Sequence, residues 1–202
     1  MSHSSAGLTP PRPWTPLTDD AWVALLPYVF PCSPQGRRIA DLRARMNAIF
    51  HLASTPGDPW RTLPPEYGSA QTIARYFRRL THAGLWHRLL ETLADPALAP
   101  NHPLRAIEYA ICRATRRAAR LGGMPLLLLI RKLGLRTALN GPPWLLPDPL
   151  LSEMLARALP TRLPTTRAAL AALKPRLKAI AWLEKAALGR RSMPRVVRFG
   201  WP

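Results

Sequence analysis

Four polar residues near the middle of the chain have side chains that can hydrogen-bond to the edges of nucleic-acid bases. They are Ser69, Gln71, Thr72 and Arg75. Glutamine binds adenine through two hydrogen bonds, arginine binds guanine O6 and N7, and threonine offers a hydroxyl or a methyl contact. Three basic residues follow them: Arg78, Arg79 and His82. Because cationic side chains contact backbone phosphates and position a protein on a duplex, the pattern predicts base contacts by the first group and phosphate contacts by the second.

The segment that contains these residues predicts one amphipathic helix. Its apolar positions recur at helical spacing: Ile73, Phe77 and Leu80. Ser69 offers an N-cap, and Gly84 is a suitable end. The preceding WRTLPPEYG has room for only one helical turn, since two consecutive prolines interrupt it. A helical turn, a turn with proline and a basic amphipathic helix are the parts of a helix-turn-helix, whose second helix enters the major groove. A solvated polar face on an ordinary surface helix is the alternative.

The rest of the chain predicts an all-α fold, because its periodic apolar segments are separated by prolines and none alternates as a strand does. We expect a helix-turn-helix-type helical bundle followed by a basic helical C-terminal region. The expected parts are a flexible arm over residues 1–16, a helical domain over 17–96 and a basic, Pro-rich helical region over 97–202. Expected helices of the bundle, besides the one above, cover about residues 18–29, 39–53 and 85–93. Those of the C-terminal region cover about 103–121, 125–139, 149–159 and 166–188.

The charge of the chain favours a polyanionic partner. The 202 residues include 29 Lys and Arg against 11 Asp and Glu, a formal net charge of +18. Such a field attracts polyanions, so double-stranded DNA is the expected partner, and an acidic protein or an anionic membrane surface is the alternative. Most of the charge follows residue 96, where nineteen basic residues face four acidic ones. Six further arginines are candidate phosphate contacts, the last four along one face of the helix expected over residues 103–121: Arg37, Arg38, Arg105, Arg113, Arg116 and Arg120.

Other chemistries find little support in the residues. The five histidines lack the i, i+4 pairing with a nearby acid that zinc helices use, and no cofactor motif occurs, so we expect neither a metal nor a cofactor. Cys32 and Cys112 are expected to pack rather than react. No secretory signal opens the chain, and the longest aliphatic run, residues 126–130, is far below the ~20 residues of a membrane span. We therefore expect a cytoplasmic protein at the bacterial nucleoid. Its oligomeric state stays open, a homodimer included. Trp14 and Trp201 are expected to be exposed.

A series of short motifs in the first half resembles a known family. In chain order the motifs are L-T-D-x-x-W, G-R-R, D-L-R-x-x-x-N-A-I, W-R-x-L-P-P-E, Q-T-x-x-x-x-F-R-R and G-x-W-x-x-L-L-E. They cover about residues 17–94, and this stretch resembles the N-terminal domain of bacterial insertion-sequence transposases of the IS-five-like kind. The resemblance implies a helical domain that binds transposon DNA ends. In full-length relatives this domain leads into an RNase-H-like catalytic core with an Asp-Asp-Glu metal triad.

The residues after the matched stretch depart from that pattern. Residues 97–202 contain four acids, all in helical or Pro-rich settings: Glu108, Asp148, Glu153 and Glu184. Two-metal phosphoryl transfer needs acids that hold Mg²⁺ beside the scissile phosphate. We therefore expect a non-catalytic double-stranded DNA-binding protein, a transcriptional regulator or architectural factor, and not an enzyme. A truncated or inactive transposase is one alternative. An interaction protein that uses basic helices on an acidic partner or a membrane surface is the other.

Overall fold

The computed structural model consists of helices and connecting segments. It describes residues 8–29, 41–55, 57–162, 164–190 and 193–201. None of these residues lies in a strand, which confirms the expected all-α fold. The chain divides into two compact units: unit 1 comprises Met1–Asn140 with Phe199–Pro202, and unit 2 comprises Gly141–Arg198. The three parts expected from the sequence follow charge and resemblance rather than contacts, and that division stays a prediction.

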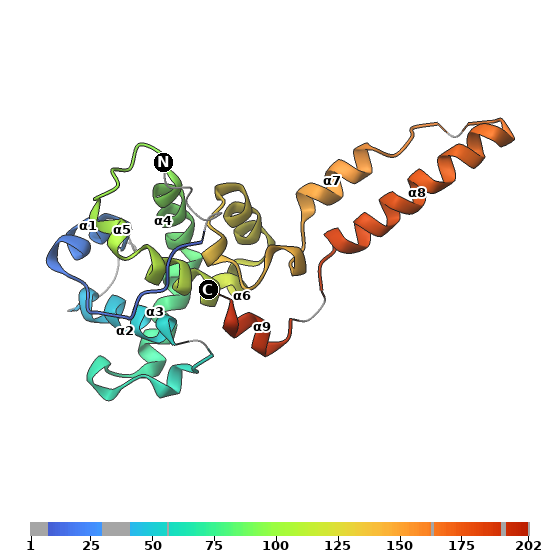
Figure 1. Cartoon of the computed structure of the whole chain (residues 1–202). Helices are drawn as coiled ribbons and strands as arrows, with labels where there is room; N and C mark the ends of the chain where they lie inside the picture. The colour runs from blue at the N-terminus through green and yellow to red at the C-terminus, as the bar shows by residue number, and fades with distance from the viewer. Residues whose placement is uncertain (1–7, 30–40, 56, 163, 191–192, 202) are drawn as a thin grey trace. The chain divides into compact units, whose positions relative to one another are not determined.

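The helices of unit 1 are mostly short, and they include the turn of helix expected before the basic helix. Their bounds are α1 (Asp19–Val29), α2 (Leu42–Ser54), η1 (Trp60–Thr62), η2 (Pro65–Tyr67), α3 (Ala70–His82), α4 (Leu85–Ala94), α5 (Pro103–Ala106), α6 (Glu108–Leu133) and η3 (Arg136–Ala138). Figure 1 labels the α-helices among them. The helices expected in the first half agree with α1, α2, α3 and α4 to within a few residues. Residues 39 and 40 of the second expected helix lie outside the described part.

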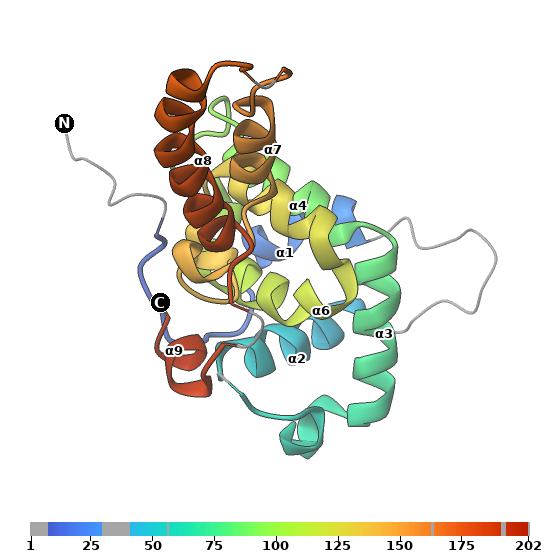
Figure 2. The ribbon, with the colours of Figure 1, turned by 90° about the vertical axis from the view of Figure 1, so that its right-hand side faces the viewer.

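Helix α6 lies at the centre of unit 1 and packs against α2, α3, α4 and η3. Eight of its side chains between residues 110 and 118 are buried, and together they cover the whole circumference of the helix. Ala110, Ala114 and Ala118 share one face, where short side chains let neighbouring helices approach closely. In Figure 2, α2 and α6 lie on the inner side of α3, which borders unit 1.

The helices around α6 differ in part from expectation. The helix expected over residues 103–121 is divided at Ile107, whose backbone (φ −106°, ψ 10°) departs from the helical region. Gly123 has φ 57° and ψ −148°, so the expected stop between the two helices appears as a kink inside α6. The helix expected to reach residue 139 ends at Leu133, because Gly134 takes the left-handed conformation of a C-cap (φ 71°).

The segment before α1 is tied to unit 1 from residue 9 onward. The Thr9 backbone N–H donates to Thr137 Oγ1 at 2.7 Å, and Thr9 Oγ1 donates to Glu108 Oε1 at 2.7 Å. The ring of Trp14 lies 5.7 Å from that of Phe50, and Trp14 is half-buried, so the expectation that it is exposed is wrong. Residues 1–7 lie outside the described part, and the mobility expected for residues 1–16 stays a prediction.

Unit 2 is a helical hairpin with a short connecting turn before it. Its elements are η4 (Pro143–Leu145), α7 (Pro149–Arg157), α8 (Arg167–Ala187) and the first residues of α9 (Arg195–Gly200). Asp148 Oδ1 caps α7 by accepting from the Leu151 N–H, and Thr166 Oγ1 caps α8 by accepting from the Ala169 N–H. Helices α7 and α8 pack against each other. None of the described helices has the length and apolar character needed to cross a membrane.

Candidate nucleic-acid interface

The polar face expected to contact DNA is exposed on α3. All seven side chains assigned to it are solvent-exposed: Ser69, Gln71, Thr72, Arg75, Arg78, Arg79 and His82. Within the described residues, none of these side chains forms a hydrogen bond or an ion pair. Ser69 occupies the N-cap position, but its hydroxyl makes no capping bond. The whole set is therefore available to a partner.

These side chains follow the geometry of a recognition helix. Gln71, Arg75, Arg78 and His82 are spaced by four, three and four residues, which places them along one line of α3. Thr72 lies beside this line near the N-terminus of the helix. In a helix-turn-helix the first residues of the second helix face base edges, and its later basic residues reach the backbone. The order of polar and basic residues along α3 fits that arrangement.

An aromatic cluster holds the inner face of α3. Phe77 is buried, and its ring centroid lies 5.2 Å from that of Trp60 in η1 and 5.6 Å from that of Trp86 in α4. Tilted ring pairs at such distances add about 0.5–1.5 kcal/mol each beyond burial. Trp86 is fully buried, whereas Trp60 is half-buried. The cluster fixes α3 to the segments before and after it in the chain.

A buried hydrogen-bond chain closes the junction between α3 and α4. Trp86 Nε1 donates to Thr81 Oγ1 at 2.9 Å, and Thr81 Oγ1 donates to the Phe77 carbonyl oxygen at 2.9 Å. Both polar side chains are thereby satisfied inside the core. Gly84 has φ 73° at the turn between the helices, a left-handed conformation that glycine adopts without steric cost.

Arg117 connects α6 to the segment before α3. Its Nη2 donates to the Leu52 carbonyl at 2.9 Å and to the Asp58 carbonyl at 2.8 Å, and its guanidinium lies 5.2 Å from the Trp60 ring centroid. Burial lowers the pKa of Arg117 below its ordinary value. The arginine stabilises η1 and, through the Trp60 ring, the position of α3.

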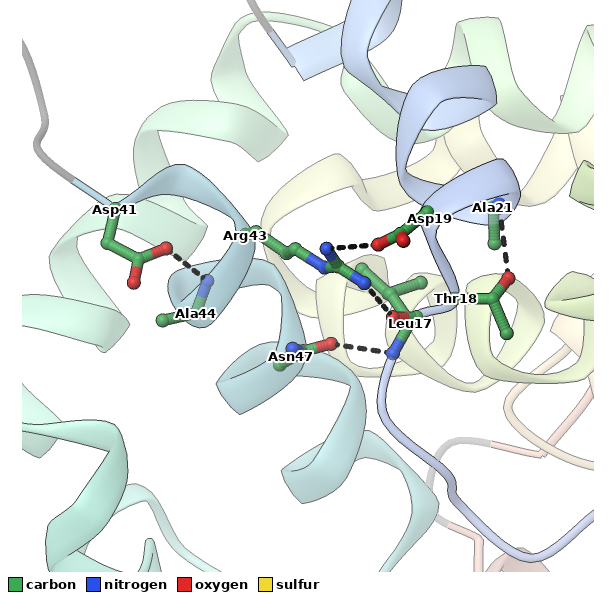
Figure 3. Close-up of polar contacts among 8 residues, drawn as sticks. All are labelled: Leu17, Thr18, Asp19, Ala21, Asp41, Arg43, Ala44 and Asn47. Atoms are coloured by element: carbon green, nitrogen blue, oxygen red, sulfur yellow. Dashed lines mark hydrogen bonds and ion pairs between the residues drawn. The ribbon is translucent and has the colours of Figure 1, made fainter.

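A polar cluster joins α1 to α2 (Figure 3). Arg43 Nη1 forms an ion pair with Asp19 Oδ1 at 2.6 Å, and Arg43 Nη2 donates to the Leu17 carbonyl. The Leu17 N–H donates to Asn47 Oδ1 at 3.0 Å. Thr18 Oγ1 accepts from the Ala21 N–H at 3.2 Å and so caps α1. Side chains of two short motifs thus join two consecutive helices.

The arginines expected along one face of α6 do not form one exposed surface. Arg113 and Arg116 are buried: Arg113 Nε donates to the Ala53 carbonyl, and Arg116 donates to the carbonyls of Thr137 and Trp201. The expectation that these two contact phosphate is corrected, because both side chains are buried and their guanidiniums donate to backbone carbonyls. Trp201 is half-buried rather than exposed, and its Nε1 donates to the Arg136 carbonyl at 3.2 Å.

The other expected phosphate contacts differ among themselves. Arg120 is exposed, while Arg105 is half-buried and pairs with Glu108 at 3.2 Å. Arg37 and Arg38 lie outside the described residues. Sequence reasoning missed Arg61, an exposed cation on η1, which packs against α3. Its place beside Trp60, a residue of the packed aromatic cluster, is the signal that could have identified it.

Burial sets the electrostatics inside unit 1. Desolvation, helped by the neighbouring Arg113, lowers the pKa of Arg116 to about 9. Desolvation and the nearby Glu108 carboxylate raise the pKa of the Cys112 thiol to about 12, so this buried cysteine stays protonated near neutral pH. In the part of the chain that the structure describes, no group of three or more His, Cys, Asp or Glu side chains could hold a metal ion.

Comparison with protein families gives a match within the first half of the chain. Residues 17–90 match a family described as "Putative transposase of IS4/5 family". The N-terminal region is related to insertion-sequence transposases. No curated protein and no solved structure matches the chain significantly. The matched residues contain α1 to α3 and most of α4, and therefore both the aromatic cluster and the exposed face of α3.

Proposed function

We propose that this transposase-derived protein binds double-stranded DNA through the exposed face of α3. The proposed base contacts are Ser69, Gln71, Thr72 and Arg75, and the proposed phosphate contacts are Arg78, Arg79 and His82. The observation that carries the proposal is the contrast between the two faces of one helix. The inner face is fixed by Phe77 and Thr81, whereas every polar side chain of the outer face is exposed and without an internal partner.

The motifs of the matched region support this distinction between residues that stabilise the fold and residues that bind DNA. Leu17, Asp19, Arg43 and Asn47 belong to those motifs and bond to one another, so their presence is explained by the fold. Gln71, Thr72, Arg78 and Arg79 belong to the same series of motifs, but their side chains are exposed and form no hydrogen bond or ion pair within the described residues. Residues of a shared motif that do not stabilise the fold are candidates for binding. Exposed Arg61 and Arg120 are further candidates for phosphate contact.

We further propose that the protein does not catalyse DNA strand transfer and acts at the nucleoid as a regulator or architectural factor. Each acid of residues 97–202 forms a hydrogen bond or an ion pair with another residue of the protein. Glu108 accepts from Thr9 and Arg105, Glu153 pairs with Arg157, Glu184 accepts from Ser152, and Asp148 caps α7. A truncated transposase that competes for transposon ends is the second candidate, supported by the family description of residues 17–90. Cleavage or joining of labelled duplex in Mg²⁺ or Mn²⁺ would overturn the non-catalytic proposal.

Selection of bound duplexes from a random pool, with the full chain, tests the binding proposal. We expect a shared sequence motif. Removal of the Arg75 guanidinium (Arg75→Ala) should cost about 1–3 kcal/mol on the selected site and relax the preference at one position. Arg79→Ala should weaken binding to all sequences alike and reduce the salt dependence. Arg136→Ala, which removes an exposed arginine of unit 1 outside α3, is the matched control. A pool without any shared sequence would contradict the base contacts.

The selected sites also report the oligomeric state. A homodimer that places two copies of α3 on one duplex should select two half-sites separated by about one helical turn, roughly 34–36 Å. Single half-sites would indicate that one copy binds alone.

A further inference from the structure

A line of four basic residues runs along α8 in unit 2. The residues are Arg167, Lys174, Lys178 and Lys185. Their spacings of seven, four and seven residues place all four within about 40° of one line along an α-helix of 3.6 residues per turn. At a rise of 1.5 Å per residue the line is about 27 Å long. We call these four residues the α8 stripe.

The charge of the α8 stripe is not compensated inside unit 2. All four side chains are exposed, and none of them forms a hydrogen bond or ion pair within the described residues. The three acids of unit 2 are bound elsewhere: Glu153 to Arg157, Glu184 to Ser152 and Asp148 to the N-terminus of α7. The α8 stripe is therefore a row of cations that lacks an internal counter-charge.

The packing of α8 leaves the stripe accessible. Helix α7 covers the side of α8 that carries Leu177 and Ile180, and these side chains line an open groove of about 590 Å³ between the two helices. None of the four stripe residues lines that groove. Arg176 lies about half a turn from the stripe and donates to the Ala158 carbonyl at 3.0 Å. The contact with α7 thus orients α8 without using the stripe.

We propose that the α8 stripe binds the phosphate backbone of double-stranded DNA, independently of base sequence. A duplex carries one charge per about 1.7 Å of axis, so about 16 phosphates lie along the length of the stripe. The choice of DNA over an anionic membrane rests on the proposed function of α3. A second cationic surface in the same chain adds to the attraction for the same kind of polyanion.

The test measures duplex affinity of the full chain against salt concentration. The stripe variant replaces the four cations with glutamine (Arg167→Gln, Lys174→Gln, Lys178→Gln, Lys185→Gln). Each lost phosphate contact should reduce the slope of log K against log salt by about 0.9. We expect a reduction of about 2–4 and at least tenfold weaker binding to a random-sequence duplex at 50 mM salt, as an estimate from the same relation.

A control variant removes the same charge from unit 2 outside the stripe. It replaces four other exposed arginines: Arg157, Arg162, Arg190 and Arg195, each by glutamine. Circular dichroism verifies that both variants keep the helical content of the parent chain. The proposal requires a clearly smaller loss in the control variant than in the stripe variant. Equal losses would show that only the diffuse charge of unit 2 matters, and would overturn the proposal.

Two further arms separate this proposal from that for α3 and from membrane binding. A third variant, Arg75→Gln with Arg78→Gln and Arg79→Gln, removes the α3 cations. If it alone loses affinity and sequence preference, the α3 proposal stands and the stripe proposal fails. If only the stripe variant loses affinity, the reverse holds. If the stripe variant loses binding to phosphatidylserine vesicles but keeps its affinity for the duplex, the stripe is a membrane surface and the DNA proposal is wrong.

Discussion

Replacement of Thr81 by valine tests whether α3 is positioned by the buried hydrogen-bond chain at its end. Valine has nearly the shape of threonine, so the packing of the site changes little. The substitution removes the acceptor of Trp86 Nε1, and Trp86 is fully buried. It also removes the bond from Thr81 Oγ1 to the Phe77 carbonyl. Thr81→Val therefore leaves a buried indole N–H without its partner.

The magnitude follows from the burial of that indole. A buried donor left unsatisfied costs about 1–3 kcal/mol, whereas removal of both partners together can be nearly neutral. We expect Thr81→Val to lower the free energy of unfolding by about 1–3 kcal/mol in urea denaturation of the full chain. Trp86→Phe removes the donor and some packing, and the double variant should cost less than the two single variants added together.

The control substitution is made on the same helix and has the same chemistry. Thr72 is exposed and lacks an internal hydrogen-bond partner, so Thr72→Val should change the free energy of unfolding by less than about 0.5 kcal/mol. The order should be reversed for DNA binding: Thr72→Val should weaken binding more than Thr81→Val, since Thr72 is a proposed base contact. Two results would refute the role assigned to the buried hydrogen bonds of Thr81. One is an equal loss of stability in Thr81→Val and Thr72→Val, and the other is a double variant with Trp86→Phe whose loss equals the sum of the two single losses.

Two further predictions concern α6. Arg116→Gln should lower the free energy of unfolding by about 1–3 kcal/mol in urea denaturation, because two backbone carbonyls lose their donor. Arg120→Gln, the control, should change the free energy of unfolding by less than about 0.5 kcal/mol. Equal effects of the two substitutions would contradict the burial of Arg116 and the exposure of Arg120. In a Cys32→Ser background, Cys112 should resist iodoacetamide at pH 8.5 until the chain unfolds, because its pKa is raised to about 12. The folded state keeps a thiol proton that the unfolded chain releases above pH 9, so this residue's contribution to stability should fall as pH rises from about 9 to 12. Rapid labelling of the folded protein would show that the thiol is accessible.

The outer part of the fold could be predicted from the sequence because each helix there has one solvent face. Ile73, Phe77 and Leu80 recur at helical spacing and are buried, as the periodicity indicates. Between them, Arg75, Arg78 and Arg79 are exposed, whereas Tyr76 is buried as well. The interruption near Gly123 could also be predicted, because the sequence separates two helices there and the structure has a kink inside α6. Amphipathic periodicity is a reliable guide when a helix lies between core and solvent.

Periodicity fails for α6 because this helix has neighbours on every side. Assigning Arg113 and Arg116 to a polar face assumed that the side opposite Ile111 and Ala114 meets water. In the structure these arginines are surrounded by α2, η3 and the C-terminal residues. The acceptors of Arg116 lie 21 and 85 residues away in the sequence, so no local sequence pattern predicts them.

Whether an arginine of this protein is buried or exposed depends on what its helix packs against. On α6 a buried guanidinium is retained only because backbone carbonyls replace its water, and such bonds cost stability if either partner is lost. On α3 the side chains of Arg75, Arg78 and Arg79 are exposed to water and have no internal acceptor within the described residues. Only the second kind can exchange water and counterions for phosphate. Exposure without an internal partner, rather than positive charge itself, is what makes the α3 face a candidate for binding DNA.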